Sequence, residues 1–354
     1  MIPAPATASA ATESDASGSA AAEPAATASV AVDSAATDSA ATGSAPVVLL
    51  PYPAEQVPGL PDGLELHTFD GDACDGRPGP PPAELLARVE MLVTPYLRTG
   101  TVLPFLGSMP RLRVVQTQTA GVDDIAPHLP AGVTLCNARG VHDASTAELA
   151  VALALASLRD LPGFVRGQDA EQWRSGFYPA LADKRVLIVG YGSVGAAIEA
   201  RLLPFEVEVT RVARTARTAP QGPVHSLAEL PELLPHADVV ILAVPLTDQT
   251  RHLVDARFLA AMRDGALLVN VARGAVVRTD DLLAELTVGR LRAALDVTDP
   301  EPLPAGHPLW HAPGVLISPH VGGSSSAFLP RAQRLIGAQL TRFANGEPLE
   351  NVMN

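Results

Sequence analysis

Apolar residues gather in short, nearly continuous runs from Pro46 onward, and helical stretches lie between these runs. The runs that we interpret as buried strands cover residues 47–50, 91–93, 112–115, 133–136, 186–189, 207–212, 239–243, 266–271, 293–297 and 315–317. The clearest helical stretch covers 144–159, with Asp143 or Ser145 near its start. Continuously apolar strands that alternate with helices are typical of parallel sheets covered on both faces. Because the alternation occurs twice, we predict an α/β fold with two doubly wound, Rossmann-like domains.

Residues 1–45 have a different composition, consisting mostly of Ala, Ser, Thr, Gly and acids, with the repeat DSAAT at 33–37 and 38–42. A segment with almost no large apolar side chain cannot offset the entropy lost on ordering. We therefore predict a disordered N-terminal tail over 1–45.

Charge and cysteine content exclude several classes of protein. The 354 residues carry 38 acids and 25 bases, and no basic run of the kind that neutralises nucleic-acid phosphates is present. Cys74 and Cys136 have no metal-binding or redox spacing, so we expect reduced structural thiols and no metal site. The start of the chain lacks the basic and apolar regions of a secretory signal, and the longest apolar helical stretch is too short to cross a bilayer. These features predict a cytoplasmic protein with neither a nucleic acid nor a membrane as partner.

The sequence VLIVGYGSVG, residues 186–195, combines an apolar strand, a glycine-rich turn and the start of a helix. In this arrangement Gly190 permits a tight turn, Gly192 lets the backbone approach a pyrophosphate, and Gly195 allows close packing of helix and strand. Free amides at the helix start then face the anion. The segment predicts a dinucleotide site formed by Gly190, Tyr191, Gly192, Ser193, Val194 and Gly195.

The end of the next strand indicates which dinucleotide is preferred. An NAD-binding strand usually ends in an acid that binds the ribose hydroxyls. This strand instead runs into Arg214 and Arg217, and guanidinium groups suit a 2′-phosphate. The alternative is that these two arginines and Arg211 are ordinary solvated charges. We favour NADP over NAD, with Arg214 as the candidate phosphate ligand.

Several longer segments resemble the D-isomer-specific 2-hydroxyacid dehydrogenase family. They are TAGVDDI (119–125), NARGVHDASTAELAVAL (137–153), ADVVILAVPLTDQTRHLVDARFLAAMRDGALLVNVARGAVV (237–277), LDVTDPEPLPAGHPLW (295–310), ISPHVGG (317–323) and RFANGEPLENV (342–352). The resemblance covers residues 46–354. It implies a substrate domain over 46–141 and 322–354, a dinucleotide-binding domain over 142–321, and an active-site cleft between them. By family analogy, the helix at 144–159 contributes to a homodimer.

The resemblance assigns catalysis to Arg273, Glu301 and His320, and elementary chemistry supports that division. Reduction of a 2-keto acid needs a hydride, a proton for the carbonyl oxygen and a cation for the carboxylate. His320 titrates near neutral pH and suits proton donation, while Glu301 can fix the other ring nitrogen. Arg273 can bind the carboxylate and polarise the carbonyl. Taken singly, the three could be a loop histidine, a surface acid and a helix-capping arginine.

Further residues match supporting positions of the family. Gly121 and Val122 match the loop whose amides bind the substrate carboxylate. Pro245 and Thr250 match the adenine side, while Val271, Ala272 and Asp296 match the nicotinamide side. Arg98 is a weaker candidate for added positive charge in the pocket. We expect His142 and His252 to be structural or hinge residues.

The segment DVTDPEPLP and the arginine after the strand at 207–212 most resemble those of glyoxylate/hydroxypyruvate reductases. The expected reaction is hydride transfer from NAD(P)H to a small 2-keto acid of this type, giving the D-2-hydroxy acid. Two alternatives remain. One is an enzyme like phosphoglycerate dehydrogenase, and the other is a non-catalytic, dinucleotide-sensing scaffold or corepressor.

Overall fold

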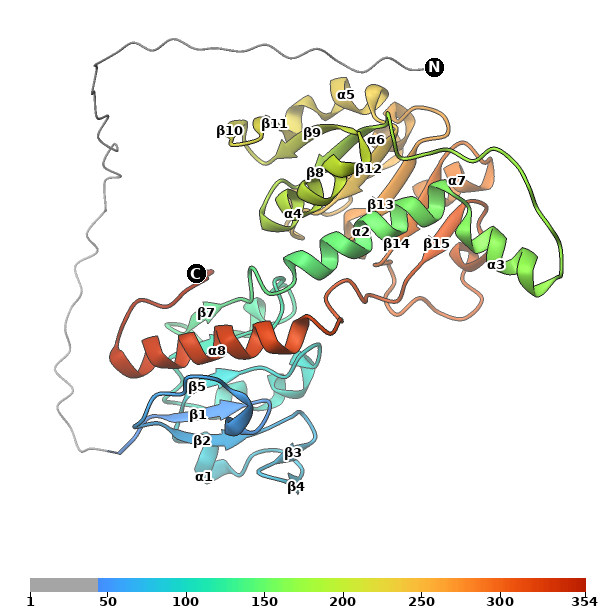
Figure 1. Cartoon of the computed structure of the whole chain (residues 1–354). Helices are drawn as coiled ribbons and strands as arrows, with labels where there is room; N and C mark the ends of the chain where they lie inside the picture. The colour runs from blue at the N-terminus through green and yellow to red at the C-terminus, as the bar shows by residue number, and fades with distance from the viewer. Residues whose placement is uncertain (1–43) are drawn as a thin grey trace, which may run out of the picture. The chain divides into compact units, whose positions relative to one another are not determined.

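Five parallel strands form the first sheet, which comes from the N-terminal part of the chain (Figure 1). The computed structural model describes residues 44–354. The sheet has the order β2-β1-β5-β6-β7. Its strands are β1 (Val47–Leu50), β2 (Glu65–Thr68), β5 (Val89–Val93), β6 (Val114–Gln116) and β7 (Thr134–Cys136). A small antiparallel pair, β3 (Ala73–Cys74) and β4 (Arg77–Pro78), and the short helix α1 (Ala83–Leu86) lie in its connections.

A second sheet has eight strands in the order β10-β11-β9-β8-β12-β13-β14-β15. These are β8 (Arg185–Val189), β9 (Glu208–Ala213), β10 (Arg217–Ala219), β11 (Gly222–Ser226), β12 (Val239–Leu242), β13 (Leu267–Asn270), β14 (Arg292–Leu295) and β15 (Val315–Ile317). All neighbouring strands pair in parallel except β10 and β11, which form an antiparallel ribbon at one edge.

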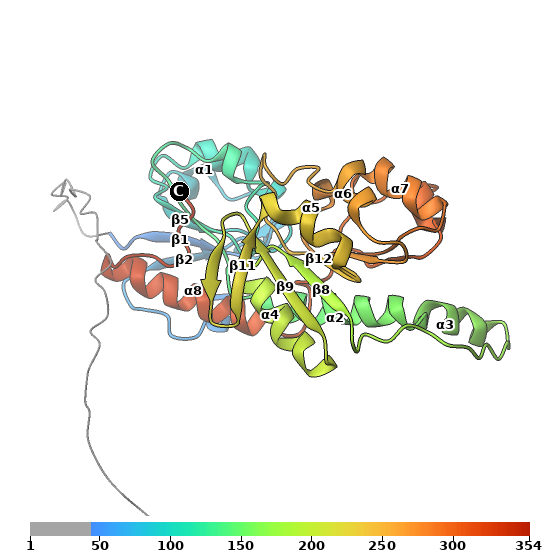
Figure 2. The same cartoon turned by 90° about the horizontal axis from the view of Figure 1, so that it is seen from above.

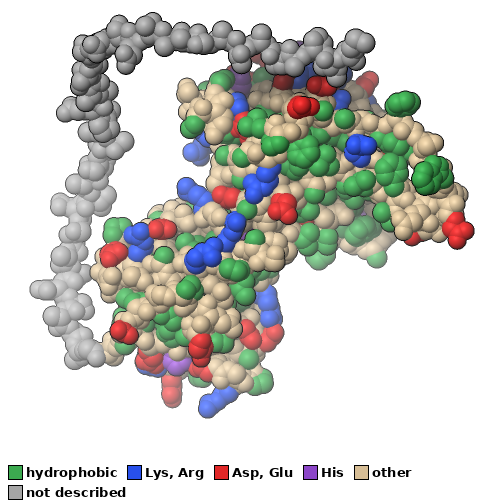
Figure 3. Space-filling view, viewed as in Figure 1, with side chains coloured by type: hydrophobic (Ala, Val, Ile, Leu, Met, Phe, Trp, Pro, Cys, Tyr) green, Lys and Arg blue, Asp and Glu red, His purple; other side chains and the backbone are tan. Residues whose placement is uncertain are grey.

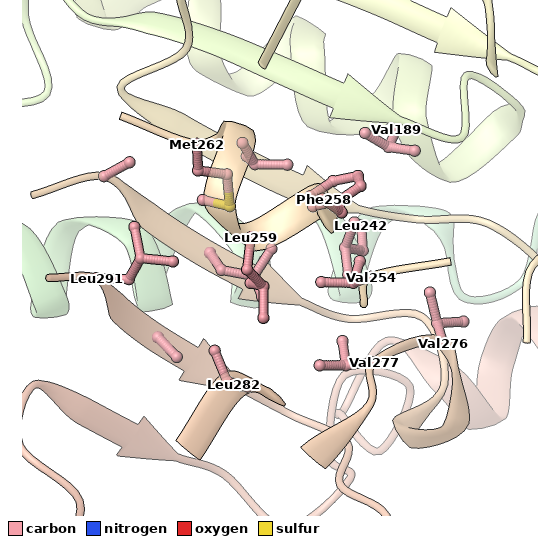
Figure 4. Close-up of a cluster of buried hydrophobic side chains, with 14 of the residues drawn as sticks. Val189, Leu242, Val254, Phe258, Leu259, Met262, Val276, Val277, Leu282 and Leu291 are labelled. Atoms are coloured by element: carbon pink, nitrogen blue, oxygen red, sulfur yellow. The ribbon is translucent and has the colours of Figure 1, made fainter. Parts of the chain in front are cut away.

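Helices cover both faces of this second sheet, so alternate side chains of one strand enter two different cores. Leu187 and Val189 pack on the face that carries α5 (Leu230–Leu233), α6 (Ala256–Ala261) and α7 (Thr279–Thr287), the cluster drawn in Figure 4. Val186 and Ile188 pack on the opposite face, against α2 (Asp143–Leu158) and α4 (Ser193–Leu202). Burial on both faces explains why the strand sequences are apolar throughout.

The last helix, α8 (Phe328–Asn345), returns to the first sheet, and Figures 1 and 2 both show it beside β1 and β5. Ile336, Leu340 and Phe343 pack against the same apolar cluster as Val48 and Leu50. The helix ends at Gly346, whose φ of +67° is the left-handed conformation that favours glycine at a helix C-terminus.

The α/β fold predicted from the sequence is confirmed, and strands occupy all ten predicted positions with ends that differ by a few residues. The prediction missed five strands, β2, β3, β4, β10 and β11, and the helix α3 (Leu161–Asp169). β2 is only half-buried and β10 is largely exposed, so neither has an apolar run. The predicted tail over 1–45 lies almost wholly outside the described residues. In the part of the chain that the structure describes, no helix is long and apolar enough to cross a membrane.

Candidate active site

Three neighbouring parallel strands, β13, β14 and β15, end at the same edge of the second sheet. Arg273 follows the first strand, Glu301 follows the second, and His320 follows the third. Ligands of open α/β sheets bind outside the carboxyl ends of the strands. The fold therefore brings together three residues that lie apart in the sequence.

The turn that carries His320 is held by Asp296, which is 3% exposed. The Asp296 carboxylate accepts hydrogen bonds from Ser318 Oγ at 2.6 Å and from the backbone amides of Val321 and Gly322 at 2.9 and 2.8 Å. Its carbonyl oxygen accepts from the amide of His320 at 2.7 Å. His320 has a φ of +53°, a conformation that costs energy for a residue other than glycine. These four contacts fix that conformation.

His320 and Glu301 are in direct contact, because Nδ1 of His320 lies 2.5 Å from Oε1 of Glu301. This hydrogen bond raises the pKa of His320 above 6.5, although burial opposes the change. Burial raises the pKa of Glu301, but the hydrogen bond and charge of His320 outweigh it and lower the pKa overall. The pair therefore favours an imidazolium beside a carboxylate.

Arg273 is positioned by its own loop and by the loop that follows β6 of the first sheet. Asn270 Nδ2 donates to the carbonyl of Arg273 at 3.0 Å, and Nη1 of Arg273 donates to the carbonyl of Ala272 at 2.8 Å. Nε of Arg273 lies 3.3 Å from Oδ1 of Asp123. A Cβ atom on Gly121 would lie 1.6 Å from Nη2 of Arg273, so the guanidinium occupies the space beside this glycine.

The predicted carboxylate loop is therefore next to the predicted carboxylate-binding arginine. Thr119 Oγ1 donates to the carbonyl of Gly121 at 2.7 Å, and Asn137 Nδ2 donates to the carbonyl of Ala120 at 2.7 Å. Val122 is partly buried against the core of the first sheet. These contacts order the loop that carries the backbone amides of residues 121 and 122.

Gly274 is a site residue that sequence reasoning missed. A Cβ atom there would lie 1.8 Å from the carbonyl oxygen of Thr298. Only glycine lets the Arg273 loop pack against the segment that leads to Glu301. The position next to Arg273 in the sequence VARG was the available signal.

The glycine-rich turn has the space that a dinucleotide pyrophosphate needs. Gly190 has a φ of +106°, and a Cβ there would lie 2.4 Å from the carbonyl carbon of Ala243. At Gly195 an added Cβ would lie 2.3 Å from the carbonyl oxygen of Gly190, whereas at Gly192 it would meet no atom within 4 Å. Two glycines thus permit close packing and the third faces open space at the start of α4, as a pyrophosphate cradle requires. Ser193 Oγ lies 3.2 Å from Asp143, and Val194 packs against the core.

Behind this turn lies a buried ionic network that the sequence prediction missed. Glu199 on α4 is 1% exposed and accepts hydrogen bonds from Arg211 and from the hydroxyl of Tyr191, with Arg211 Nε at 2.9 Å. The Tyr191 hydroxyl oxygen also lies 3.2 Å from Oε1 of Gln221, and Arg217 donates to the carbonyl of Tyr191 at 2.5 Å. The available signal was an acid directly after the run VGAAI, residues 194–198.

The network separates the three arginines considered for the 2′-phosphate. Arg211 is not an ordinary solvated charge, because it is bound to Glu199 and largely buried. Arg217 contacts the backbone of Tyr191. Arg214 follows β9 directly and is exposed, and none of the described residues pairs with its guanidinium.

Pro245 and Thr250 lie in one turn after β12. Thr250 is 5% exposed, and its Oγ1 donates to the carbonyl of Pro245 at 2.6 Å and accepts from the amide of Thr247 at 2.8 Å. Val271 and Ala272 are buried beside the end of β13. The Asp296 carboxylate, matched by family analogy to the nicotinamide side, is the group that anchors the His320 turn.

The other candidates from the sequence have clear surroundings. Arg98 binds Asp72 through two hydrogen bonds of 2.7 and 2.6 Å, so its charge is balanced there. His142 is buried and stacks on Tyr96 and Phe328, with ring centroids 5.5 and 5.3 Å away. Cys136 is buried at the end of β7 as a free thiol. Among the described residues no group of three or more His, Cys, Asp or Glu could hold a metal ion.

Comparison with known proteins places this site in a family. Residues 151–322 match the family model described as "D-isomer specific 2-hydroxyacid dehydrogenase, NAD binding domain". The chain is 30% identical over 312 residues to a glyoxylate reductase of Aeropyrum pernix, covering 83% of this chain and 93% of the relative. It is 34% identical over 250 residues to the human glyoxylate reductase/hydroxypyruvate reductase, covering 67% and 76%.

Solved structures agree with this match. A D-isomer specific 2-hydroxyacid dehydrogenase from Xanthobacter autotrophicus, solved in complex with NADPH and MES, has a TM-score of 0.72 at 29% identity, covering 88% of this chain and 98% of that one. A family protein from Aeromonas salmonicida has a TM-score of 0.74 at 28% identity, covering 88% and 99%. The chain belongs to the D-isomer-specific 2-hydroxyacid dehydrogenase family and is an NAD(P)-dependent oxidoreductase that acts on CH–OH groups.

Proposed function

We propose that this enzyme reduces a small 2-keto acid of the glyoxylate or hydroxypyruvate type to the D-2-hydroxy acid, with NADPH preferred over NADH. The observation that carries the proposal is the 2.5 Å contact between His320 and Glu301, on the same sheet edge as Arg273. The names of the relatives, glyoxylate reductase and hydroxypyruvate reductase, support this substrate class.

In this proposal His320 gives a proton to the carbonyl oxygen of the substrate. Glu301 occupies Nδ1, which leaves the other ring nitrogen to donate. The raised pKa of His320 keeps the imidazolium available near neutral pH. Glu301 also stabilises that cation, as a buried acid does in other histidine pairs.

Arg273 binds the carboxylate of the substrate, together with the backbone amides of Gly121 and Val122. The 3.3 Å contact with Asp123 holds the guanidinium in the direction of this loop. A substrate carboxylate can form shorter, charge-assisted hydrogen bonds than this contact. The carboxylate and the carbonyl oxygen of the substrate are then both held. Together they fix which face of the carbonyl carbon can receive the hydride.

The dinucleotide would be held by residues that follow the strands of the second sheet. The pyrophosphate would be held by the turn of Gly190, Tyr191, Gly192, Ser193, Val194 and Gly195, and Arg214 would bind the 2′-phosphate. Pro245 and Thr250 would line the adenine side, and Val271 and Asp296 the nicotinamide side. When bound, the cofactor supplies the hydride to the carbonyl carbon. Two observations support this assignment: the open space at Gly192, and the exposed guanidinium of Arg214, with which none of the described residues pairs.

We further propose that residues 46–141 and 322–354 form the substrate domain and 142–321 the dinucleotide domain, each centred on one sheet. A homodimer is the expected assembly. The segment after α2 supports it, because Leu161, Val165, Trp173 and Phe177 are exposed, Trp173 at 97%. Figure 3 shows hydrophobic side chains gathered on this part of the face, where a second copy would cover them.

Initial rates with purified protein test the function. NADPH and NADH are each assayed with glyoxylate, hydroxypyruvate, pyruvate and 3-phosphohydroxypyruvate. The proposal expects glyoxylate or hydroxypyruvate with NADPH to give the highest kcat/KM. Preference for 3-phosphohydroxypyruvate would favour the phosphoglycerate dehydrogenase alternative. Dinucleotide binding without turnover of any substrate would favour the sensing scaffold.

A further inference from the structure

We infer that Arg139, Arg331 and Arg334 form a binding site for a small anion with at least two negative charges, carried as phosphate or as paired carboxylates. None of these residues belongs to the active site proposed above. The three side chains line one pocket of about 380 Å³. Its remaining lining residues are Gly140, Val141 and Leu335, so no acid of the described residues lines it.

The charges in this pocket are unbalanced within the described residues. No ion pair is formed there by any of the three guanidinium groups, whereas Arg88, Arg98, Arg211, Arg290 and Arg342 each bind a carboxylate. Like charges around one cavity repel one another, and an anion between them removes that repulsion. Arginine is also the side chain whose planar fork best matches phosphate and carboxylate oxygens.

The position of Arg331 and Arg334 on α8 adds to this argument. The helix begins at Phe328, and no acidic residue lies in its first turn. The N-terminal end of a helix carries partial positive charge and disfavours cations. Helical side chains also lean toward the N-terminus, which brings both guanidinium groups closer to that end. Arg331, the fourth residue of the helix, is therefore unfavourable there alone and favourable with a bound anion, and Arg334 lies about one turn further along.

The backbone of Arg139, which lines the same pocket as this helix, is held by two hydrogen bonds. Its amide donates to Asn137 Oδ1 at 3.1 Å, and its carbonyl accepts from Asn351 Nδ2 at 3.2 Å. Two of the lining residues, Val141 and Leu335, pack in one small apolar cluster with Ala332. A fixed backbone beneath an exposed guanidinium lowers the entropic cost of binding an anion.

Hydrogen bonds connect the segment next to this anion site with the loop that contains Gly121. Arg139 lies on the connection from β7 to α2, and α8 follows the connection from β15. On the first connection, Asn137 and Ala138 donate to the carbonyls of Ala120 and Thr119, which precede Gly121. An anion bound by both Arg139 and the arginines of α8 therefore restricts the motion of the segment with Asn137 and Ala138, which orders the proposed carboxylate loop. We expect it to lower KM for the keto acid and to leave the NADPH Kd unchanged.

Calorimetric titration of the full chain with saturating NADPH tests the site, because the cofactor then fills the pyrophosphate cradle. Pyrophosphate and citrate are the two probes, and the tighter one identifies the preferred anionic group. In the variant Arg331→Gln/Arg334→Gln we expect at least a tenfold weaker Kd, with kcat in the absence of added anion unchanged. Arg257→Gln, an exposed arginine on α6, is the matched control.

Two outcomes overturn the inference. Either neither probe binds the parent at millimolar concentration, or the double variant binds both probes within twofold of the parent. If the parent binds no anion and the double variant changes oligomeric state, the pocket is instead a contact between subunits. Circular dichroism and thermal unfolding of the variant establish that it is folded.

Discussion

The backbone of Gly121 packs directly against the guanidinium of Arg273, because a Cβ atom at residue 121 would lie 1.6 Å from Nη2 of Arg273. Gly121 follows β6 and Arg273 follows β13. The absence of a side chain at the first residue thus permits the position of the guanidinium at the second. This dependence is specific enough to test.

Replacing Gly121 with Ala should displace the Arg273 guanidinium. We expect kcat/KM for the keto acid to fall by about 10- to 100-fold, the cost of one misplaced charged hydrogen bond. The NADPH Kd should change little. Gly107→Ala is the matched control, since a Cβ there meets no atom within 4 Å. Equal effects of the two substitutions on kcat/KM would rule out the proposed contact.

Replacing Glu301 with Gln should lower the pKa of His320, because its hydrogen bond and negative charge are what raise that pKa. Reduction needs the protonated ring, so the rate falls as pH rises through the pKa of His320. The alkaline limb of the kcat/KM profile should therefore move to lower pH. The loss of rate should be larger near about pH 8 than near about pH 6. An unmoved limb would contradict the pairing.

Removing the imidazole should separate chemistry from cofactor binding. For His320→Ala we expect kcat to fall by about 100-fold or more, the usual contribution of a general acid. Fluorescence titration with NADPH should give nearly the parent Kd. Near-normal turnover would remove His320 from the proton-transfer role.

Arg214→Ala should weaken NADPH binding more than NADH binding. Loss of a charge-assisted contact to phosphate corresponds to roughly a 10- to 100-fold change in Kd. NADH lacks the 2′-phosphate, so its Kd should stay within about twofold. Arg257→Ala is the control for loss of an exposed positive charge. An equal loss with both cofactors would leave the 2′-phosphate without this ligand.

Glu199→Gln should destabilise the fold and loosen the glycine-rich turn. The substitution removes the charge partner of Arg211, whose side chain is only 12% exposed. We expect the free energy of unfolding to fall by about 3 kcal/mol. Chemical denaturation measures that loss, and Glu208→Gln on the exposed start of β9 is the control.

A second variant separates stability from positioning. Glu199→Leu with Arg211→Met removes both charges and should recover most of the lost stability. If the network positions Tyr191, this double variant should still bind NADPH more weakly than the parent. A parent-like Kd in the stable double variant would limit the network to a structural role.

The local sequence predicted the buried strands well, because each carries its apolar signal within three to six residues. Val186–Ile188 is apolar on both faces, and the structure shows a separate core on each side. β2 and β10 were missed because edge strands that remain partly exposed need no apolar run. The burial of Glu199 was missed because the sequence does not show that Arg211 and Tyr191 lie close enough to bind its carboxylate.

What the sequence determined by itself was the α/β class, the glycine-rich turn and the identity of the groups able to do the chemistry. Periodicity and residue type are local properties, so they can be read along the chain. The tertiary structure alone decided that Glu301 lies 2.5 Å from His320 and that Arg273 lies against Gly121. It also decided that Arg211 pairs with Glu199, whereas Arg214 has no partner among the described residues. Each of these relationships joins separate elements of the fold. Parallel strand order and close packing, which only the folded chain possesses, bring them within contact distance.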